Sequence, residues 1–139
     1  VYGDLAMSDV LPTGYLNGSS ISVYGNVTTT SNGKRGTTNI YMLGSANSNL
    51  SCGASAAIPG STFTIQKDVG YKVTQTAACS FASSGQNFTV QSGEHNMGGY
   101  NLTINNYLTV NTGAALTAAG GTYSPSSGAK YSCLGTCSP

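Results

Sequence analysis

The chain has 139 residues, of which five are basic and four acidic, and its net charge is +1. Charged residues make up 6% of the chain, against about 25% in a typical soluble domain. This balance excludes an electrostatic case for nucleic acid or an anionic membrane as a partner. Glycine, serine, threonine and asparagine together make up nearly half of the chain, which is therefore polar without being charged. The length predicts a single domain.

The first residue and the cysteines predict an exported protein. The chain starts at Val1 rather than at methionine, which a removed leader would explain. No apolar run is long enough for a transmembrane helix, so we expect no membrane insertion. The four cysteines are an even number and predict two disulfides in an extracellular or cell-surface protein. Of the three possible pairings, the spacing favours Cys52–Cys79 and Cys133–Cys137.

The low surface charge calls for another source of solubility. A sugar coat is one source, and the Asn-x-Ser/Thr pattern occurs at Asn17, Asn26, Asn49, Asn87 and Asn101. We expect a glycan on at least one of them, with Asn17 or Asn26 favoured. An acidic habitat and assembly into a polymer are the alternative explanations.

Taken in chain order, residues 1–14 form an N-terminal extension before a single β domain at 15–139. Pro12 and Gly14 separate the two. The extension is a possible donor strand, with apolar candidates for assembly at Leu5, Met7, Val10 and Leu11. Alternation places Leu5 and Met7 on one face of it.

Strand patterns then dominate, and helix patterns are nearly absent. Alternating or apolar segments predict strands at 20–24, 38–43, 62–66 and 71–75. We expect the last two to form a hairpin turned at Lys67–Gly70, with Asp68 as a turn residue. Its buried face would hold Phe63, Ile65, Tyr71 and Val73.

The C-terminal third has short strand patterns at 87–90, 101–104, 107–110 and 114–117, separated by Gly and Asn pairs. The run Asn101-Leu102-Thr103-Ile104-Asn105-Asn106-Tyr107-Leu108-Thr109-Val110-Asn111-Thr112-Gly113-Ala114 resembles rungs of secreted β-solenoid adhesins of the autotransporter type. For residues 86–121 the resemblance implies a short β-solenoid. No such repeat is visible before residue 86, so an all-β, antiparallel β-sandwich is the expected fold of the whole chain.

Candidate catalytic and metal-binding groups are few. The single histidine, His95, lies beside Glu94, but adjacent strand residues face opposite sides, and we expect a solvated loop there. Asp68 and Glu94 would have to face one another for a two-carboxylate glycosidase. Cys133, Cys137 and His95 could supply metal ligands, but the disulfide interpretation takes precedence. We therefore expect no catalytic site, metal site or cofactor.

The composition resembles that of pilin and thread subunits that donate strands to one another. We expect a structural subunit of an extracellular filament or cell-surface layer that joins head to tail by strand donation, with itself as the main partner. The main alternative is an adhesin or carbohydrate-binding module that uses some of the nine tyrosines against glycans or a cell surface. A small secreted hydrolase is a more distant alternative.

Overall fold

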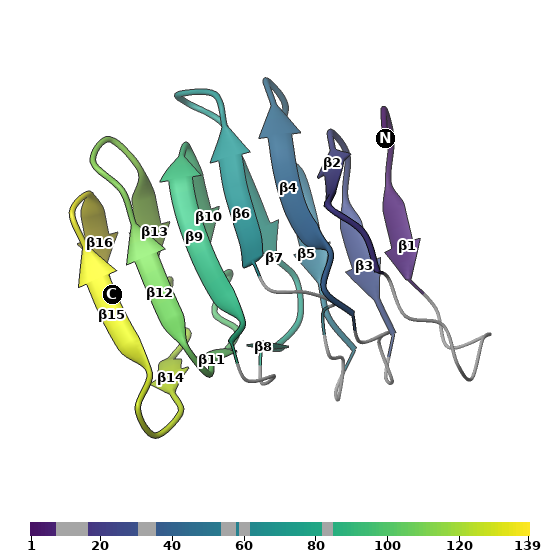
Figure 1. Ribbon diagram of the computed structural model, residues 1–139. Coiled ribbons are helices and arrows are strands. Elements are labelled where there is room, and N and C mark those ends of the chain that lie inside the picture. The colour runs from purple at the N-terminus through teal and green to yellow at the C-terminus, as the bar shows by residue number, and fades with distance from the viewer. Residues whose placement is uncertain (8–16, 31–35, 54–57, 59–61, 82–84) are drawn as a thin grey trace.

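The computed structural model describes residues 1–7, 17–30, 36–53, 58, 62–81 and 85–139. They form a β-solenoid, in which the chain winds repeatedly around one axis and every paired strand is parallel to its neighbours (Figure 1). The described residues include no helix, and hence none long and apolar enough to cross a membrane.

Three sheets run along the solenoid axis. Sheet I has seven strands, in the order β1 (Leu5–Met7), β3 (Val27–Thr29), β5 (Ser48–Ser51), β7 (Lys72–Gln75), β10 (Glu94–Asn96), β13 (Ala115–Thr117) and β16 (Thr136–Ser138). Sheet II has six, in the order β2 (Ser20–Val23), β4 (Asn39–Gly44), β6 (Thr62–Lys67), β9 (Asn87–Ser92), β12 (Tyr107–Val110) and β15 (Lys130–Cys133). Sheet III is short, with β8 (Cys79–Phe81), β11 (Leu102–Ile104) and β14 (Tyr123–Pro125).

The expected antiparallel sandwich is therefore wrong. The solenoid that the resemblance implied for the C-terminal third extends through the described chain, from β1 to β16. The expected hairpin is also wrong, because β6 pairs with β4 and β9 in sheet II while β7 pairs with β5 and β10 in sheet I. The turn at Asp68 thus carries the chain from one sheet to the other, and Tyr71 is partly exposed.

Most of the individual strand predictions are confirmed, because local alternation reports which side chains face inward. The segments expected at 20–24, 38–43, 62–66 and 71–75 correspond to β2, β4, β6 and β7. Those in the C-terminal third correspond to β9, β11, β12 and β13. The N-terminal extension contributes β1, which pairs with β3 of its own chain.

The coil length varies, which hides the repeat in the sequence. Ile21 and Ile40 occupy equivalent places in neighbouring coils, as do Phe63 and Phe88, but the second pair is further apart along the chain than the first. The variation lies in the corners, so that the strands stay in register while the sequence period does not. The absence of a visible repeat before residue 86 was for this reason no guide to the fold.

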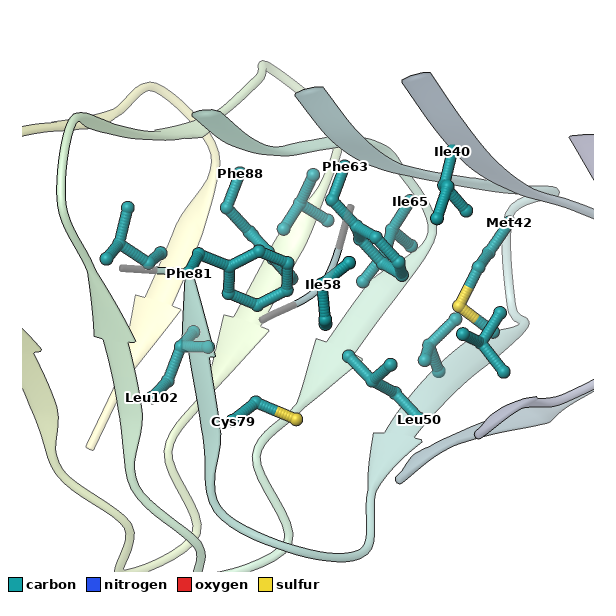
Figure 2. Packing of buried hydrophobic residues seen from close by; sticks show 14 of the residues in the cluster. Ile40, Met42, Leu50, Ile58, Phe63, Ile65, Cys79, Phe81, Phe88 and Leu102 are labelled. Carbon is teal, nitrogen blue, oxygen red and sulfur yellow. The ribbon is translucent and has the colours of Figure 1, made fainter. Parts of the chain in front are cut away.

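The core is a stack of inward-facing columns, one residue from each coil. One column of sheet II runs Ile21, Ile40, Phe63, Phe88, Leu108 and Tyr131. Phe63 and Phe88 stack with ring centroids 5.6 Å apart, and Phe81 of sheet III meets Phe88 edge-on at 4.9 Å (Figure 2). Such aromatic contacts add to the burial of apolar area, and all three rings are fully buried.

Side-chain hydrogen bonds also connect neighbouring coils. Asn26 donates from Nδ2 to the Asp4 carboxylate and accepts at Oδ1 from the backbone N–H of Asn49. Asn106 donates to Oδ1 of Asn87 at 2.8 Å. Each of these bonds joins residues 19 to 23 positions apart. The abundant asparagines therefore serve as ties between coils.

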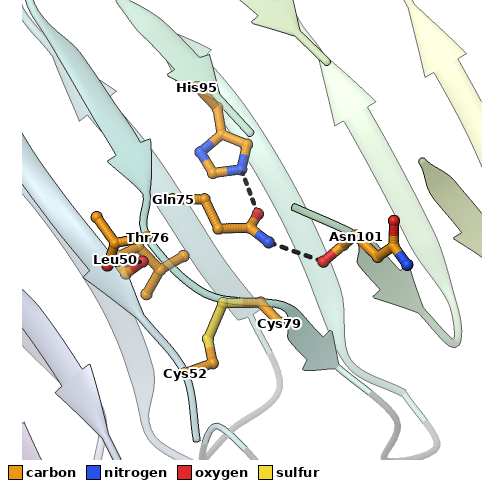
Figure 3. Close-up of a disulfide and its surroundings, with 7 residues drawn as sticks. All are labelled: Leu50, Cys52, Gln75, Thr76, Cys79, His95 and Asn101. Atoms are coloured by element: carbon orange, nitrogen blue, oxygen red, sulfur yellow. Dashed lines mark hydrogen bonds between the residues drawn. A yellow bond between two sulfur atoms is a disulfide. The ribbon is translucent and has the colours of Figure 1, made fainter. Parts of the chain in front are cut away.

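Both expected disulfides are confirmed. Cys52–Cys79 joins the end of β5 to β8 in the next coil (Figure 3), and Cys133–Cys137 closes the corner between β15 and β16. In the chain-entropy account the first loop, of 27 residues, contributes about 3.5 kcal/mol and the second, with a separation of 4, about 2 kcal/mol. The first bridge is thus the larger constraint on the unfolded chain.

Candidate functional site

The strongest candidate for a functional surface is the C-terminal end of the solenoid. A partly open cavity of about 250 Å³ lies there, lined by Met97, Leu116, Ala118, Tyr123, Tyr131, Cys137, Ser138 and Pro139. These residues belong to the last coils or directly follow their strands. Inside the solenoid the next coil covers such columns, but here no further coil of the described chain does so. The cavity therefore lies against the last coils of the described chain.

Two tyrosines give this end its chemical character. The rings of Tyr123 and Tyr131 lie 5.6 Å apart between centroids, at 40° to each other. Burial raises the pKa of both phenols, and for Tyr123 the neighbouring Tyr131 adds to the effect. The hydroxyl oxygen of Tyr123 is buried and makes no hydrogen bond within the described part of the chain. The end thus offers apolar surface together with one unsatisfied polar group.

Large apolar side chains also stand exposed at this end. Tyr131 is 49% exposed although it continues a buried column, and Leu134, in the corner between β15 and β16, is 66% exposed. Lys130 lies over the ring of Tyr107, with Nζ 5.4 Å from the ring centroid. Exposed apolar groups around an open core are typical of a surface that another chain covers.

The N-terminal end presents a comparable surface among the described residues. Leu5 and Ile21 begin inward-facing columns and are only partly buried. Tyr2 stacks on Tyr24 with centroids 4.8 Å apart. Asp4 accepts hydrogen bonds from the backbone and side chain of Asn26, which lower the pKa of its carboxyl group. These contacts tie residues 2–5 to the following coil.

His95 is not in a solvated loop, so that expectation is wrong. It lies in β10, fully buried, with its ring 5.0 Å from that of Phe88. Its Nε2 lies 3.3 Å from Oε1 of Gln75, whose Nε2 donates to the carbonyl oxygen of Asn101 (Figure 3). Burial lowers the pKa of His95 to about 3, against a smaller opposing effect of the Val73 backbone.

This environment does not suit acid–base catalysis. A histidine with so low a pKa stays neutral near pH 7, and it has no solvent contact through which substrate could reach it. Glu94 and Asn96 flank it in the strand and point to the outer face of sheet I. His95 and Gln75 therefore pair inside the core, while Nδ1 of His95 is buried and makes no side-chain hydrogen bond within the described residues.

Lys67 is a buried lysine that the sequence analysis did not identify. Its Nζ donates to the carbonyl oxygen of Leu43 at 2.7 Å and to Oγ of Ser48 at 2.8 Å. Burial lowers its pKa, and nearby Asp68 opposes this effect. The alternation Phe63, Ile65, Lys67 contains the signal, because it continues the inward face of β6.

The structure does not bring together the remaining residues considered for a glycosidase or a metal site. Asp68 lies in the corner after β6, whereas Glu94 lies in β10 of sheet I. Cys133 and Cys137 are bonded to each other and His95 is in the core. Within the described residues no group of three His, Cys, Asp or Glu side chains could hold a metal ion.

The sequons fall in different environments. Asn17 and Asn49 are exposed, and Asn101 is exposed although its Oδ1 accepts from the backbone N–H of Thr122. Asn26 and Asn87 are half-buried and bonded to neighbouring coils. Of the expected assembly residues, Leu5 is partly buried and Met7 is 6% exposed in the core, while Val10 and Leu11 lie outside the described residues.

No protein-family model, curated protein or solved structure matches this chain.

Proposed function

We propose that the chain is a structural subunit of an extracellular filament or cell-surface layer, in which solenoids join end to end. One observation carries the proposal: the outer edges of β1, β2, β15 and β16 have no neighbouring strand within the described residues. An open strand edge is a ready template for pairing with another chain. The last described coil also has exposed apolar side chains beside a partly open cavity, which is typical of a surface that another chain covers.

The body of the molecule suits a structural role. Its coils are held by continuous parallel pairing, by side-chain ties such as Asn26 to Asp4, and by the Cys52–Cys79 bridge. The near absence of charge leaves little repulsion between copies. Two disulfides fit an oxidising compartment outside the cytosol. Rigidity, weak repulsion and open ends together favour a polymer.

In this fold, assembly by stacking of intact ends is favoured over donation of the N-terminal strand. A donated strand was expected to fill the groove of a sandwich, and the solenoid has no such groove. Met7 is a core residue and β1 is paired within its own chain, so releasing this segment would open the first coil. Stacking of intact ends needs no release and uses the same backbone pairing as the coils.

Size and shape after concentration test the proposal. The purified chain should give oligomers by size-exclusion chromatography with light scattering, and rods one solenoid wide by electron microscopy. Both measurements are made under non-reducing conditions, so that the two disulfides stay intact. A chain that stays monomeric at millimolar concentration, with no rods, would contradict the structural role.

A carbohydrate-binding module is the second candidate, and the Tyr2–Tyr24 pair favours it. Tyr2 is 94% exposed, and its stacking on Tyr24 presents an aromatic platform of the kind that sugar rings use. Retention of a monomeric chain on a polysaccharide column, and loss of that retention in Tyr2→Ala, would support this candidate over the filament. A column that does not retain the chain would remove it.

A further inference from the structure

Apart from tyrosine, the side chains that oxidants attack most readily are shielded in this protein. The chain has no tryptophan, and its four cysteines are joined in two disulfides. All three methionines, Met7, Met42 and Met97, lie in the core with at most 6% of their surface exposed. The described residues therefore expose neither a free thiol nor a thioether, which are common sites of oxidation. Oxidation at the surface is left to the tyrosines.

Two pairs of tyrosine rings are in contact among the described residues. Tyr2 stacks on Tyr24, with ring centroids 4.8 Å apart and ring planes at 12°. Tyr123 lies 5.6 Å from Tyr131, with ring planes at 40°. Two oxidised phenols join only when their rings meet, so a pair that the fold holds in contact reacts within one molecule. An isolated tyrosine needs a second copy of the chain for the same reaction.

Contacts between coils hold the first pair in place. The backbone N–H of Tyr24 donates to the carbonyl oxygen of Val1 at 3.2 Å, which brings the backbone of Tyr24 beside that of Tyr2. The ring of Tyr24 also lies close to Gly44 in the following coil, where an added Cβ would come within 2.9 Å of Cδ1 of Tyr24. Tyr24 therefore has packing partners in both neighbouring coils, and its ring stays beside that of Tyr2.

The two tyrosine pairs differ in their contact with solvent. Tyr2 is 94% exposed and Tyr24 is 39% exposed, so an oxidant reaches both phenols and water accepts their protons. The hydroxyl oxygen of Tyr123, in contrast, is buried and makes no hydrogen bond within the described residues. Burial also raises the pKa of Tyr123 and Tyr131, which disfavours loss of the phenolic proton. Oxidation therefore favours the pair of Tyr2 and Tyr24.

We propose that Tyr2 and Tyr24 form a site of oxidative cross-linking, at which a haem peroxidase with hydrogen peroxide joins the two rings. The peroxidase removes one electron and one proton from each phenol, and the two phenoxyl radicals form one carbon–carbon bond between ring positions ortho to the oxygens. Each ring regains its aromaticity by transfer of the ortho hydrogen to its oxygen. One hydrogen peroxide is reduced to two waters, and the product, dityrosine, has two hydrogen atoms fewer than the two tyrosines.

The cross-link would add a covalent tie between neighbouring coils. It would join the segment before β1 to the corner after β2, beside the backbone pairing of β1 with β3. Tyr2, which is almost fully exposed, has room to turn as the bond forms. Unlike the two disulfides, a carbon–carbon bond is not cleaved by thiols. The inference does not depend on the proposed assembly, because both rings belong to one copy of the chain.

Treatment of the dilute, purified chain with a haem peroxidase and hydrogen peroxide tests the proposal. Size-exclusion chromatography under denaturing, non-reducing conditions separates monomers from covalent oligomers, and fluorescence measures the dityrosine in each fraction. Digestion beside aspartate cuts the chain at Asp4 and Asp9, between the two tyrosines, before mass spectrometry. Monomers should yield a fragment pair that joins Tyr2 to Tyr24 and is lighter by two hydrogen atoms. Dityrosine found only in oligomers, or in monomers chiefly between other tyrosines, would overturn the proposal.

Phenylalanine variants separate this pair from the other exposed tyrosines. Tyr2→Phe keeps a ring for the stack but has no phenol to oxidise, so the monomer fraction should lose its dityrosine fluorescence. The control is Tyr100→Phe, at a tyrosine that is 44% exposed and has no aromatic ring partner among the described residues. It should leave the monomer fluorescence unchanged. Circular dichroism verifies the fold of both variants, and fluorescence that survives Tyr2→Phe, or falls equally in both variants, would overturn the proposal.

Discussion

The buried His95 makes the stability of the protein depend on pH in a defined range. In the folded chain its pKa is about 3, against an ordinary value of 6.5. As the pH falls through 6.5, His95 therefore becomes protonated in the unfolded chain but stays neutral in the folded chain. Stability is fully present above that value and is lost progressively between 6.5 and about 3.

The magnitude follows from the linkage relation. Between pH 7.5 and pH 5 the free energy of unfolding should fall by about 2 kcal/mol, and the full loss down to pH 3 is about 5 kcal/mol. The carboxyl groups titrate mainly near pH 4, so His95 dominates the upper part of this range. Even the first of these losses, about 2 kcal/mol, is a large share of the stability of a small domain.

Urea unfolding with intact disulfides, at half-unit steps from pH 7.5 to pH 5, measures this decline. His95→Leu is the matched variant, because Leu116 occupies the equivalent place one coil further on. Its stability should be nearly constant over the same range, whatever its absolute value. A parent curve without a decline, or the same decline in the variant, would refute the reasoning. Imidazole proton signals that titrate near pH 6.5 in the folded protein would refute it as well.

Three further predictions concern the contacts between coils. Removing the Cys52–Cys79 bridge by double alanine substitution should lower the free energy of unfolding by about 3.5 kcal/mol, against about 2 kcal/mol for Cys133–Cys137; urea unfolding that gives the reverse order would contradict the loop argument. Gly98→Ala should cost more than about 2 kcal/mol, because its φ is +60° and an added Cβ would overlap the carbonyl oxygen of Gln75. Gly113→Ala, with a φ of +82° and open space around it, should cost only about 1 kcal/mol, and equal thermal shifts of the two variants would argue against close coil stacking there. Asn26→Ala should destabilise the chain by about 1–3 kcal/mol through its lost ties to Asp4 and Asn49, and an unchanged melting temperature would show that these ties contribute nothing.

The sequence contained the strands but not their partners. Alternation in segments such as 62–66 and 107–110 reports which side chains face inward, and the structure agrees. It does not report whether the next strand along the chain pairs with this one or crosses to another sheet. The short corner at Lys67–Gly70 has the length of a hairpin turn, yet it turns the chain into sheet I. Local turn chemistry could not separate these two outcomes.

The buried polar residues show the same limit. Gln75 and His95 are polar, so composition places them at the surface, but each continues an inward-facing position of its strand. They are compatible with the core only because they meet one another 20 residues apart in sequence. Both disulfide pairings were accessible because the partners lie near in sequence: Cys52 and Cys79 are about one coil apart, and Cys133 and Cys137 flank one corner.

X-ray diffraction from aligned, concentrated protein tests most directly the claim that solenoids join end to end through their strand edges. In such an assembly every strand runs across the filament axis, and spacing between strands is continuous through each joint. The account predicts a strong meridional reflection at about 4.7–4.9 Å, the distance between paired strands. Aligned filaments that place this reflection on the equator, or a sample that contains only monomers and no filaments, would contradict it.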